Sequence, residues 1–313
     1  MFKMLHIAGV IAVLLTGLPG CDAGGPSQKI NLEKKEPLAK RSGQQRENTL
    51  RVAVGGMITP KAGYGYYRQF LDYIGEQLNL HIEFVDRDNY AEINRLVKTG
   101  GVDVAFVCGG PYVEGHDEFG MELLAAPQAS GGTVYYSYII VRADSPLARF
   151  SELRGKIFAF TDPLSNTGAL VPTYMLAKMK ETPESFFRKL VYVQSHDRAI
   201  MAVAEGLVDG AAVDSLIWEY LNKTDPGFTS KTRVLEKSPP FGIPPVVTRR
   251  DLDPRIKMKL RDVFLNAHKD EKGGAILRGM MIERFVPIED SAYDSIRQMK
   301  RRIARHAGSE EGN

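Results

Sequence analysis

The chain has 313 residues, and its 41 Lys and Arg against 38 Asp and Glu give a net charge of +3 at pH 7. A charge this small for the length excludes the strongly basic surface that nucleic-acid binding requires, so we expect no nucleic-acid partner. The part of the chain from Leu50 onward is long enough for two α/β lobes.

Residues 1–21 are predicted to be a targeting segment. Lys3 gives a positive start, and the apolar stretch 7–18 is too short for a membrane-spanning helix. The segment ends in Leu18-Pro19-Gly20-Cys21, which resembles the bacterial lipobox, in which the Cys is diacylated. We therefore expect an exported protein held by lipid on Cys21 at the extracytoplasmic face of the membrane. Because Pro19 is not the residue favoured there, an ordinary cleaved secretory signal is the alternative.

Residues 22–48 lack apolar periodicity and are rich in Gly, Gln, Lys and Glu, a composition typical of a flexible tether. If Cys21 carries lipid, Cys108 is the one remaining thiol, because the chain has two cysteines, and no internal disulfide is possible. Cys108 ends the apolar run 104–108, which predicts a small buried side chain and not a nucleophile.

The next part of the chain alternates between strand and helix patterns. We predict strands at 50–54, 80–85, 103–107, 122–126 and 133–142, and helices at 64–78 and 90–97. This order predicts a mostly parallel sheet covered by helices. The long aromatic strand 133–142 carries Tyr135 and is expected to cross from one lobe to the other.

A second α/β series follows the break at Asp144-Ser145-Pro146. We predict strands at 156–160, 191–194, 210–213 and 233–236, helices at 170–179, 197–204 and 215–221, a Pro-rich second crossing at 238–245, a strand at 246–248 that returns to the first lobe, and closing helices at 254–268, 274–280 and 290–306. Lobe 1 is then 49–141 plus 246–313, and lobe 2 is 142–245. The basic cluster Lys300, Arg301, Arg302 and Arg305 is expected to be a solvated helix face.

The most informative stretch is 160–170, which joins a predicted strand to a predicted helix. Ser165, Asn166, Thr167 and Gly168 stand where the helix begins, and there the first backbone N–H groups lack intrahelical partners. Hydroxyl groups beside such N–H groups suit a small oxyanion such as phosphate or a phosphonate. The alternative is that Ser165 or Thr167 only caps the helix.

Several motifs in order along 50–286 resemble the phosphate/phosphite/phosphonate-binding proteins of ABC transporters, the PhnD-like branch of the type II periplasmic binding proteins. They are Asp88-Asn89-Tyr90-Ala91, the strand 102–106, the tyrosine-bearing strand 135–141, the turn 162–168, Ser195-His196-Asp197 and the strand 208–214. The resemblance implies an α/β fold of two lobes joined by two crossover segments, with the ligand cleft between the lobes.

The resemblance also implies the site residues. Ser165, Asn166 and Thr167 match the family's anion cradle, where Asn replaces a Thr and still donates through its amide. His196 matches a histidine that donates to the same oxygens. Tyr90 and Tyr135 match tyrosines that reach the ligand from the opposite lobe, with packed aromatic residues as the alternative for both. Asp214 is expected either to contact a protonated ligand oxygen or to cap the next helix.

Two positions depart from the family members that bind an aminoalkyl phosphonate. In those family members two carboxylates hold the ammonium group of the ligand. The corresponding positions in this chain are Leu216 and the vicinity of Ile243 and Pro244, and none of these residues is acidic. Because an ammonium buried without a counter-charge is costly, we expect 2-aminoethylphosphonate to be a poor ligand.

The leading hypothesis is a monomeric receptor that captures the oxyanion and delivers it to an ABC permease. A receptor that presents the same ligand to a membrane sensor kinase is the alternative, and the neighbouring genes would separate the two. A hydrolase is the third hypothesis. Adjacent residues such as Ser195, His196 and Asp197 do not easily form a triad, and the sequence shows neither a nucleophile elbow nor a metal-ligand cluster. We therefore expect no catalytic residues, no metal and no cofactor.

Overall fold

The structure is a computed structural model that describes residues 48–55, 64–87 and 89–310. The predicted signal segment, including Cys21, and nearly all of the predicted tether lie outside the described residues, as does Asp88. Within the part that is described, no helix is long and apolar enough to cross a membrane.

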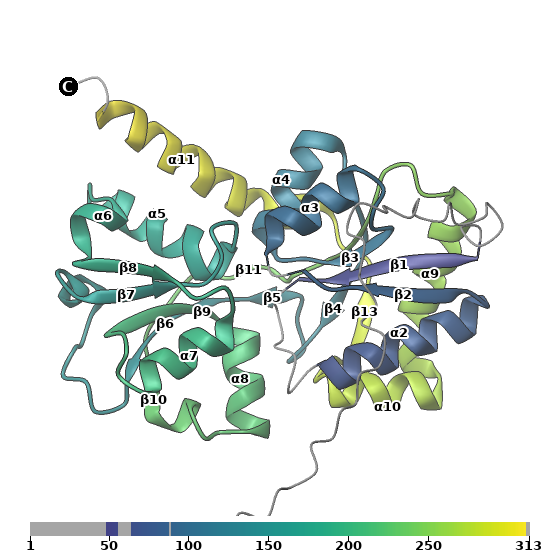
Figure 1. Ribbon diagram of the computed structural model, residues 1–313, viewed down its shortest axis with the longest axis horizontal. Helices are drawn as coiled ribbons and strands as arrows, with labels where there is room; N and C mark the ends of the chain where they lie inside the picture. The colour runs from purple at the N-terminus through teal and green to yellow at the C-terminus, as the bar shows by residue number, and fades with distance from the viewer. Residues whose placement is uncertain (1–47, 56–63, 88, 311–313) are drawn as a thin grey trace, which may run out of the picture. The chain divides into compact units, whose positions relative to one another are not determined.

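The first sheet has six strands in the order β13-β4-β12-β3-β1-β2. Their bounds are β1 Thr49–Val54, β2 His81–Val85, β3 Val104–Phe106, β4 Glu122–Gln128, β12 Val246–Thr248 and β13 Arg284–Val286. Helices α2 (Tyr64–Leu78) and α10 (Glu271–Gly279) lie on one side of the sheet, and α3 (Tyr90–Lys98) and α4 (Gly109–Phe119) lie on the other (Figure 1). Helix α9 (Pro254–Asn266) shares its buried core with α2 and α10.

The second sheet has five strands in the order β10-β6-β9-β7-β8. Their bounds are β6 Ser137–Arg142, β7 Ile157–Phe160, β8 Lys189–Tyr192, β9 Gly210–Asp214 and β10 Thr232–Lys237. The helices of this part are α5 Val171–Lys178, α6 Pro183–Phe186, α7 His196–Ala204 and α8 Ser215–Thr224, with α5 and α6 on one side and α7 and α8 on the other (Figure 1). Both sheets belong to the same compact unit of the chain.

The sheets are mixed and not mostly parallel as predicted. In the first sheet β1 pairs in parallel with β2 and β3, whereas β12 and β13 run antiparallel to their neighbours. In the second, β7 pairs in parallel with β8 and β9, whereas β6 and β10 are antiparallel. The antiparallel strands are those that the chain reaches by a crossing between the sheets or late in the sequence. The periodicity of a strand predicts the strand but not its direction relative to its neighbours.

The two crossings pair with each other. The predicted strand 133–142 divides at Tyr136 into β5 (Val134–Tyr135) and β6, and β5 pairs with β11 (Phe241–Gly242) from the Pro-rich segment. Strand β6 belongs to the second sheet, so the chain enters that sheet directly after Tyr136. Strand β12 joins the first sheet, as expected for a chain that crosses back.

Helix α4 was not predicted, and α11 begins and ends four residues later than predicted. Helix α4 begins with Gly109-Gly110-Pro111, residues that an interior helix pattern excludes. Gly110 is required by packing, because a Cβ atom there would lie 2.1 Å from the carbonyl oxygen of Leu164. Helix α11 (Asp294–Glu310) packs against both α4 and α5, so it contacts helices that cover different sheets.

Candidate functional site

The candidate residues follow the carboxyl ends of parallel strands in both sheets. Tyr90 comes after β2 and Cys108 after β3, while the turn 165–167 comes after β7, His196 after β8 and Asp214 at the end of β9. This is where ligands bind in open α/β sheets. The side chains of all the predicted ligand residues are at most 4% exposed, so the site is built inside the protein.

The turn after β7 forms the start of a helix. It begins with a π-helical turn, Asn166–Leu170, and not at Leu170 as predicted. The hydroxyl of Ser165 accepts a hydrogen bond of 3.0 Å from the N–H of Gly168, so the capping role is confirmed. Thr167 Oγ1 and Asn166 Oδ1 are buried and have no hydrogen-bond partner among the described residues. Buried polar atoms of this kind are costly unless something else satisfies them.

Gly168 permits the tight approach of this turn to the end of β7. The carbonyl oxygen of Gly168 accepts a hydrogen bond of 3.2 Å from the N–H of Thr161. A Cβ atom on Gly168 would lie 1.9 Å from Thr161 Oγ1 and 3.0 Å from Ser165 Oγ. Only glycine fits this position without displacing the hydroxyl groups around it.

His196 is a neutral hydrogen-bond donor at physiological pH. Burial lowers the pKa of its imidazole to about 4, although nearby Asp197 acts in the opposite direction. The N–H of Asp214 donates to His196 Nδ1 at 3.0 Å. Since Nδ1 accepts in the neutral ring, the proton is on Nε2, which is therefore a donor.

Asp214 fulfils the capping role and has one carboxylate oxygen left over. Its Oδ1 accepts a hydrogen bond of 2.7 Å from the N–H of Leu216 at the start of α8. Its Oδ2 is buried and without a partner among the described residues. Burial raises the pKa of Asp214 to about 7, so the carboxyl group exchanges a proton near neutral pH.

Tyr135 lies on the crossing strand β5 and contacts the turn after β7. Asn166 Nδ2 donates to the Tyr135 hydroxyl at 3.1 Å, and the same hydroxyl lies 3.3 Å from Cys108 Sγ. Burial raises the pKa of both the Tyr135 hydroxyl and the Cys108 thiol, which keeps both groups protonated. Cys108 is therefore a buried thiol, as predicted, but it packs in the site and not only in the core.

Tyr90 begins α3, and its backbone connects the two halves of the site. Its N–H donates to Asp162 Oδ2 at 3.1 Å, and the N–H of Leu164 donates to Asp162 Oδ1 at 2.7 Å. Asp162 thus ties the turn after β7 to the first turn of α3, a role that sequence reasoning missed. Its position in the motif 162–168 was the available signal.

Tyr67, which is not among the predicted ligand residues, is buried on α2. Burial raises the pKa of Tyr67, Tyr90 and Tyr135, and in each case the charge of Asp214 raises it further. The pKa values of all three tyrosines therefore respond to the charge of the same carboxyl group. A helical period indicates which residues are buried, but it carries no signal for a polar neighbour.

A small cavity adjoins this cluster. It encloses about 60 Å³ and is lined by residues of both halves, among them Tyr67, Leu216, Ile243 and Pro244. One carboxylate is among its described lining residues, Glu219, which accepts a hydrogen bond of 2.5 Å from the Tyr138 hydroxyl. The cavity wall is therefore mainly apolar, with its acidic group already hydrogen-bonded.

The geometry does not favour nucleophilic catalysis. The Ser195 hydroxyl donates to Asp197 at 2.6 Å, while His196 Nδ1 is occupied by the N–H of Asp214, so Ser195 and His196 do not form a nucleophile–base pair. Among the described residues no group of three or more His, Cys, Asp or Glu side chains could hold a metal ion.

Two α/β sheets, joined by paired crossing strands and sharing buried polar residues at their strand ends, define the class of two-lobe solute-binding proteins. A family model described as "ABC transporter, phosphonate, periplasmic substrate-binding protein" matches residues 57–293. The chain belongs to this family, which consists of transport proteins and not of enzymes.

Two curated relatives resemble the chain over most of its length. The phosphonates-binding periplasmic protein of Escherichia coli (strain K12) is 28% identical over 267 residues, which cover 84% of this chain and 79% of the relative. The phosphate-import protein PhnD of Mycolicibacterium smegmatis is 27% identical over 259 residues, which cover 74% of this chain and 79% of the relative. Membership of the family makes this a periplasmic substrate-binding protein of the ABC type.

Solved structures confirm the predicted fold. A binding protein component of an ABC phosphonate transporter from Pseudomonas aeruginosa gives a TM-score of 0.78 at 25% identity, covering 83% of this chain and 87% of that one. PhnD1 from Prochlorococcus marinus, solved in complex with methylphosphonate, gives 0.75 at 22% identity, covering 82% of this chain and 98% of that one. The chain has the two-lobe type II periplasmic binding protein fold.

Proposed function

We propose that this protein captures a small phosphorus oxyanion, namely phosphate, phosphite or a small phosphonate, and delivers it to an ABC permease. The observation that carries the proposal is the set of buried polar atoms without partners, Asn166 Oδ1, Thr167 Oγ1 and Asp214 Oδ2. They lie on the turn after β7 and at the end of β9, two elements in direct contact. Thr167 Oγ1 can donate to a bound oxyanion directly, whereas Asn166 donates after its amide is turned and Asp214 donates when it is protonated. The cost of binding is small because the surrounding groups are already held in place.

The donors around this position suit an anion that has few protons of its own. His196 Nε2–H, the hydroxyl of Thr167 and the remaining O–H of Ser165 are neutral donors, and so is the hydroxyl of Tyr90. A half-turn of the Asn166 amide would let Tyr135 donate to Oδ1 and would turn the N–H groups toward the ligand. Neutral donors in a buried site hold an anion through hydrogen bonds that are strong in low dielectric surroundings.

Asp214 would give the site its preference for an oxyanion that shares a proton. With a pKa raised to about 7, its carboxyl group either donates to a phosphoryl oxygen or, when ionised, accepts from a P–OH group. Phosphate and phosphonates exchange a proton near neutral pH, whereas sulfate does not. An ionised Asp214 would therefore repel sulfate but accept a protonated phosphorus oxyanion.

The size and lining of the small cavity limit which substituent of a phosphonate it could hold. Leu216, Ile243 and Pro244 line it, and these are the positions where an ammonium-binding site would need carboxylates. Its one acidic lining residue, Glu219, is engaged by the Tyr138 hydroxyl. We therefore expect a short apolar substituent such as a methyl group, and weak binding of 2-aminoethylphosphonate.

Isothermal titration calorimetry with phosphate, phosphite, methylphosphonate, 2-aminoethylphosphonate and sulfate tests these assignments. At pH 7 we expect at least one of the first three to bind most tightly and sulfate to bind weakly. Raising the pH ionises Asp214 and should increase the preference for phosphate, which keeps a P–OH group, over sulfate, and Asp214→Asn should reduce this preference. Tighter binding of 2-aminoethylphosphonate than of the other phosphorus oxyanions would contradict the cavity assignment, and Glu219→Gln would then identify the carboxylate responsible.

We also propose that the mature protein is anchored to the membrane by lipid on Cys21. The supporting feature is the lipobox-like Leu18-Pro19-Gly20-Cys21 followed by the polar segment 22–48. In cells, the wild type should partition with membranes and incorporate labelled palmitate, whereas Cys21→Ser should do neither. Release of the wild type in soluble form without label would show an ordinary cleaved signal instead.

A further inference from the structure

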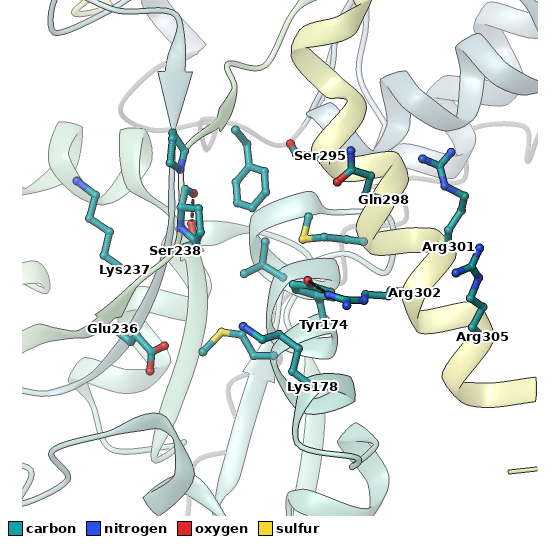
Figure 2. Close-up of a pocket in the computed structure, with 16 residues that line it drawn as sticks. Tyr174, Lys178, Glu236, Lys237, Ser238, Ser295, Gln298, Arg301, Arg302 and Arg305 are labelled. Carbon is teal, nitrogen blue, oxygen red and sulfur yellow. Dashed lines mark hydrogen bonds between the residues drawn. The ribbon is translucent and has the colours of Figure 1, made fainter. Parts of the chain in front are cut away.

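A groove outside the oxyanion site lies between α5, the segment that joins β10 to β11, and α11 (Figure 2). It encloses about 610 Å³, within the range of about 300–1,000 Å³ that small-molecule sites occupy. Its described lining residues include none of the predicted oxyanion ligands. Apolar side chains form much of its wall, among them Val171, Met175, Phe241 and Met299.

Two cations meet in this groove at one aromatic ring. Arg302 Nη1 donates to the Tyr174 hydroxyl at 3.2 Å, and Lys178 Nζ lies 5.7 Å from the centroid of the Tyr174 ring. Figure 2 shows Arg302 reaching from α11 and Lys178 from α5 into the space between the helices. Arg301 and Arg305 add positive charge on the next positions of α11.

The ion pairs that α11 forms in the described part of the chain involve residues that do not line the groove. Arg297 pairs with Asp117, Asp290 and Asp294, and Lys300 pairs with Glu114. Neither Arg302 nor Lys178 forms an ion pair with a carboxylate in the described part of the chain.

The other charged residues of the groove do not cancel this charge. Glu236 is the one carboxylate among the described lining residues. Lys237 extends away from the groove and lies over the ring of Tyr136, with Nζ 3.6 Å from its centroid. The predicted solvated face of α11 is therefore in part the wall of a positively charged groove with an apolar lining.

We propose that this groove is a second binding site, which takes an organic phosphate. The phosphoryl group, with one negative charge in a diester and up to two in a monoester, pairs with both Lys178 and Arg302. The attached apolar or aromatic part packs on Met175, Met299 and Phe241. Such a ligand bridges α5 and α11. The same chemistry is present in a free nucleotide and in an anionic phospholipid, so both serve as probes.

Calorimetric titration with adenosine diphosphate and with dihexanoylphosphatidylglycerol below its micelle concentration tests the site. The wild type should bind at least one probe in a one-to-one ratio, and the probe that binds identifies the source. The double variant Lys178→Ala/Arg302→Ala should bind it at least tenfold more weakly. The matched control Lys259→Ala/Arg278→Ala removes two exposed helix cations elsewhere and should bind like the wild type.

His196→Ala separates this site from the oxyanion site. It should leave binding of the probe within twofold of the wild type, because His196 does not line the groove. Failure of both probes to bind, or equal binding by the wild type and the Lys178/Arg302 variant, would overturn the proposal and leave the proposed oxyanion site unaffected. An unchanged melting temperature of the double variant establishes that it is folded. Arg302→Lys should keep part of the affinity that the single variant Arg302→Ala loses.

Discussion

The proposed oxyanion site and the proposed site in the groove beside α11 would bind a phosphoryl group in two different ways. The oxyanion site is buried and uses neutral groups, namely hydroxyls, an uncharged His196 and a carboxyl group that titrates near pH 7. The groove is open to solvent and uses the formal charges of Lys178 and Arg302. A buried cation would require costly desolvation, whereas fixed dipoles do not, so burial selects neutral donors and exposure permits charges.

This difference has a consequence for specificity. Neutral donors in fixed directions distinguish ligands by where their oxygens and protons lie, so the buried site is expected to be selective among oxyanions. Flexible surface cations attract any phosphoryl group and depend on salt.

Asp214→Asn should change the pH dependence of stability most. Burial raises the pKa of Asp214 to about 7, so its contribution to stability is present below about pH 4 and is lost as the pH rises to about 7. His196, whose pKa is lowered to about 4, has the opposite sign, because its contribution is present above about pH 6.5 and is lost as the pH falls. The free energy of unfolding of the variant minus that of the wild type should therefore rise with pH, by up to about 1.4 kcal/mol per pH unit between these limits.

Urea denaturation at a series of pH values measures this difference. His196→Asn serves as the control and should change the slope in the opposite direction. Parallel curves for Asp214→Asn and the wild type would mean that the carboxyl group is not desolvated as the structure indicates.

Gly168→Ala should destabilise the protein by about 3 kcal/mol, at the upper end of the range for overpacking, and should also abolish oxyanion binding. The added Cβ atom would lie 1.9 Å from Thr161 Oγ1 and must push the turn away. Gly65→Ala, where no atom lies within 4 Å, is the matched control and should be neutral or slightly stabilising. Thermal and urea denaturation give the stabilities, and a Gly168→Ala variant with wild-type affinity would remove the turn from the site.

His196→Ala and Ser165→Ala should each weaken oxyanion binding by about 1–3 kcal/mol, the usual cost of a lost hydrogen bond to a charged group. Ser165→Ala should also lower stability, since its hydroxyl caps the helix at Gly168. Calorimetric titration measures both, with the exposed His81→Ala as control. Wild-type affinity in both variants would place the oxyanion elsewhere.

Tyr135→Phe should have a smaller effect, below about 1 kcal/mol on affinity. The ring keeps its packing against Phe241, while the hydroxyl that accepts from Asn166 is lost. The same titration measures the loss, and Tyr192→Phe at the exposed edge of the second sheet is the control. A loss as large as that of His196→Ala would make Tyr135 a principal ligand and not a support for Asn166.

Salt should affect ligand affinity at the two proposed sites differently. An increase from 50 to 500 mM sodium chloride should change the affinity of the oxyanion site by less than about twofold, because buried interactions are screened weakly. The groove should lose several-fold more of its affinity for the bound probe under the same titration. Equal salt dependence of the two would contradict the contrast between buried dipoles and exposed charges.

Sequence periodicity was most reliable where local pattern and packing agree. The helix 64–78 was predicted with its observed bounds because its apolar residues repeat on one face. Helix α4 was missed because Gly109 and Gly110 oppose helix formation locally, while the fold requires Gly110 for its contact with Leu164. Glycine at position 110 made the helix hard to predict, and it also allows the first turn of α4 to pack against Leu164 beside the turn 165–167.

The sequence by itself determined the two series of strands and helices, the crossings at Tyr135 and in the Pro-rich segment, and the polar turn 165–167. Local propensity and period are enough for these features, and the order of the motifs was enough to indicate the family. Only the tertiary structure decided that Tyr135 and Cys108 meet at that turn, and that Lys178 and Arg302 share a groove. These residues are far apart in the chain, and their neighbours depend on how the strands order and how α11 returns across the second sheet, which no local pattern specifies.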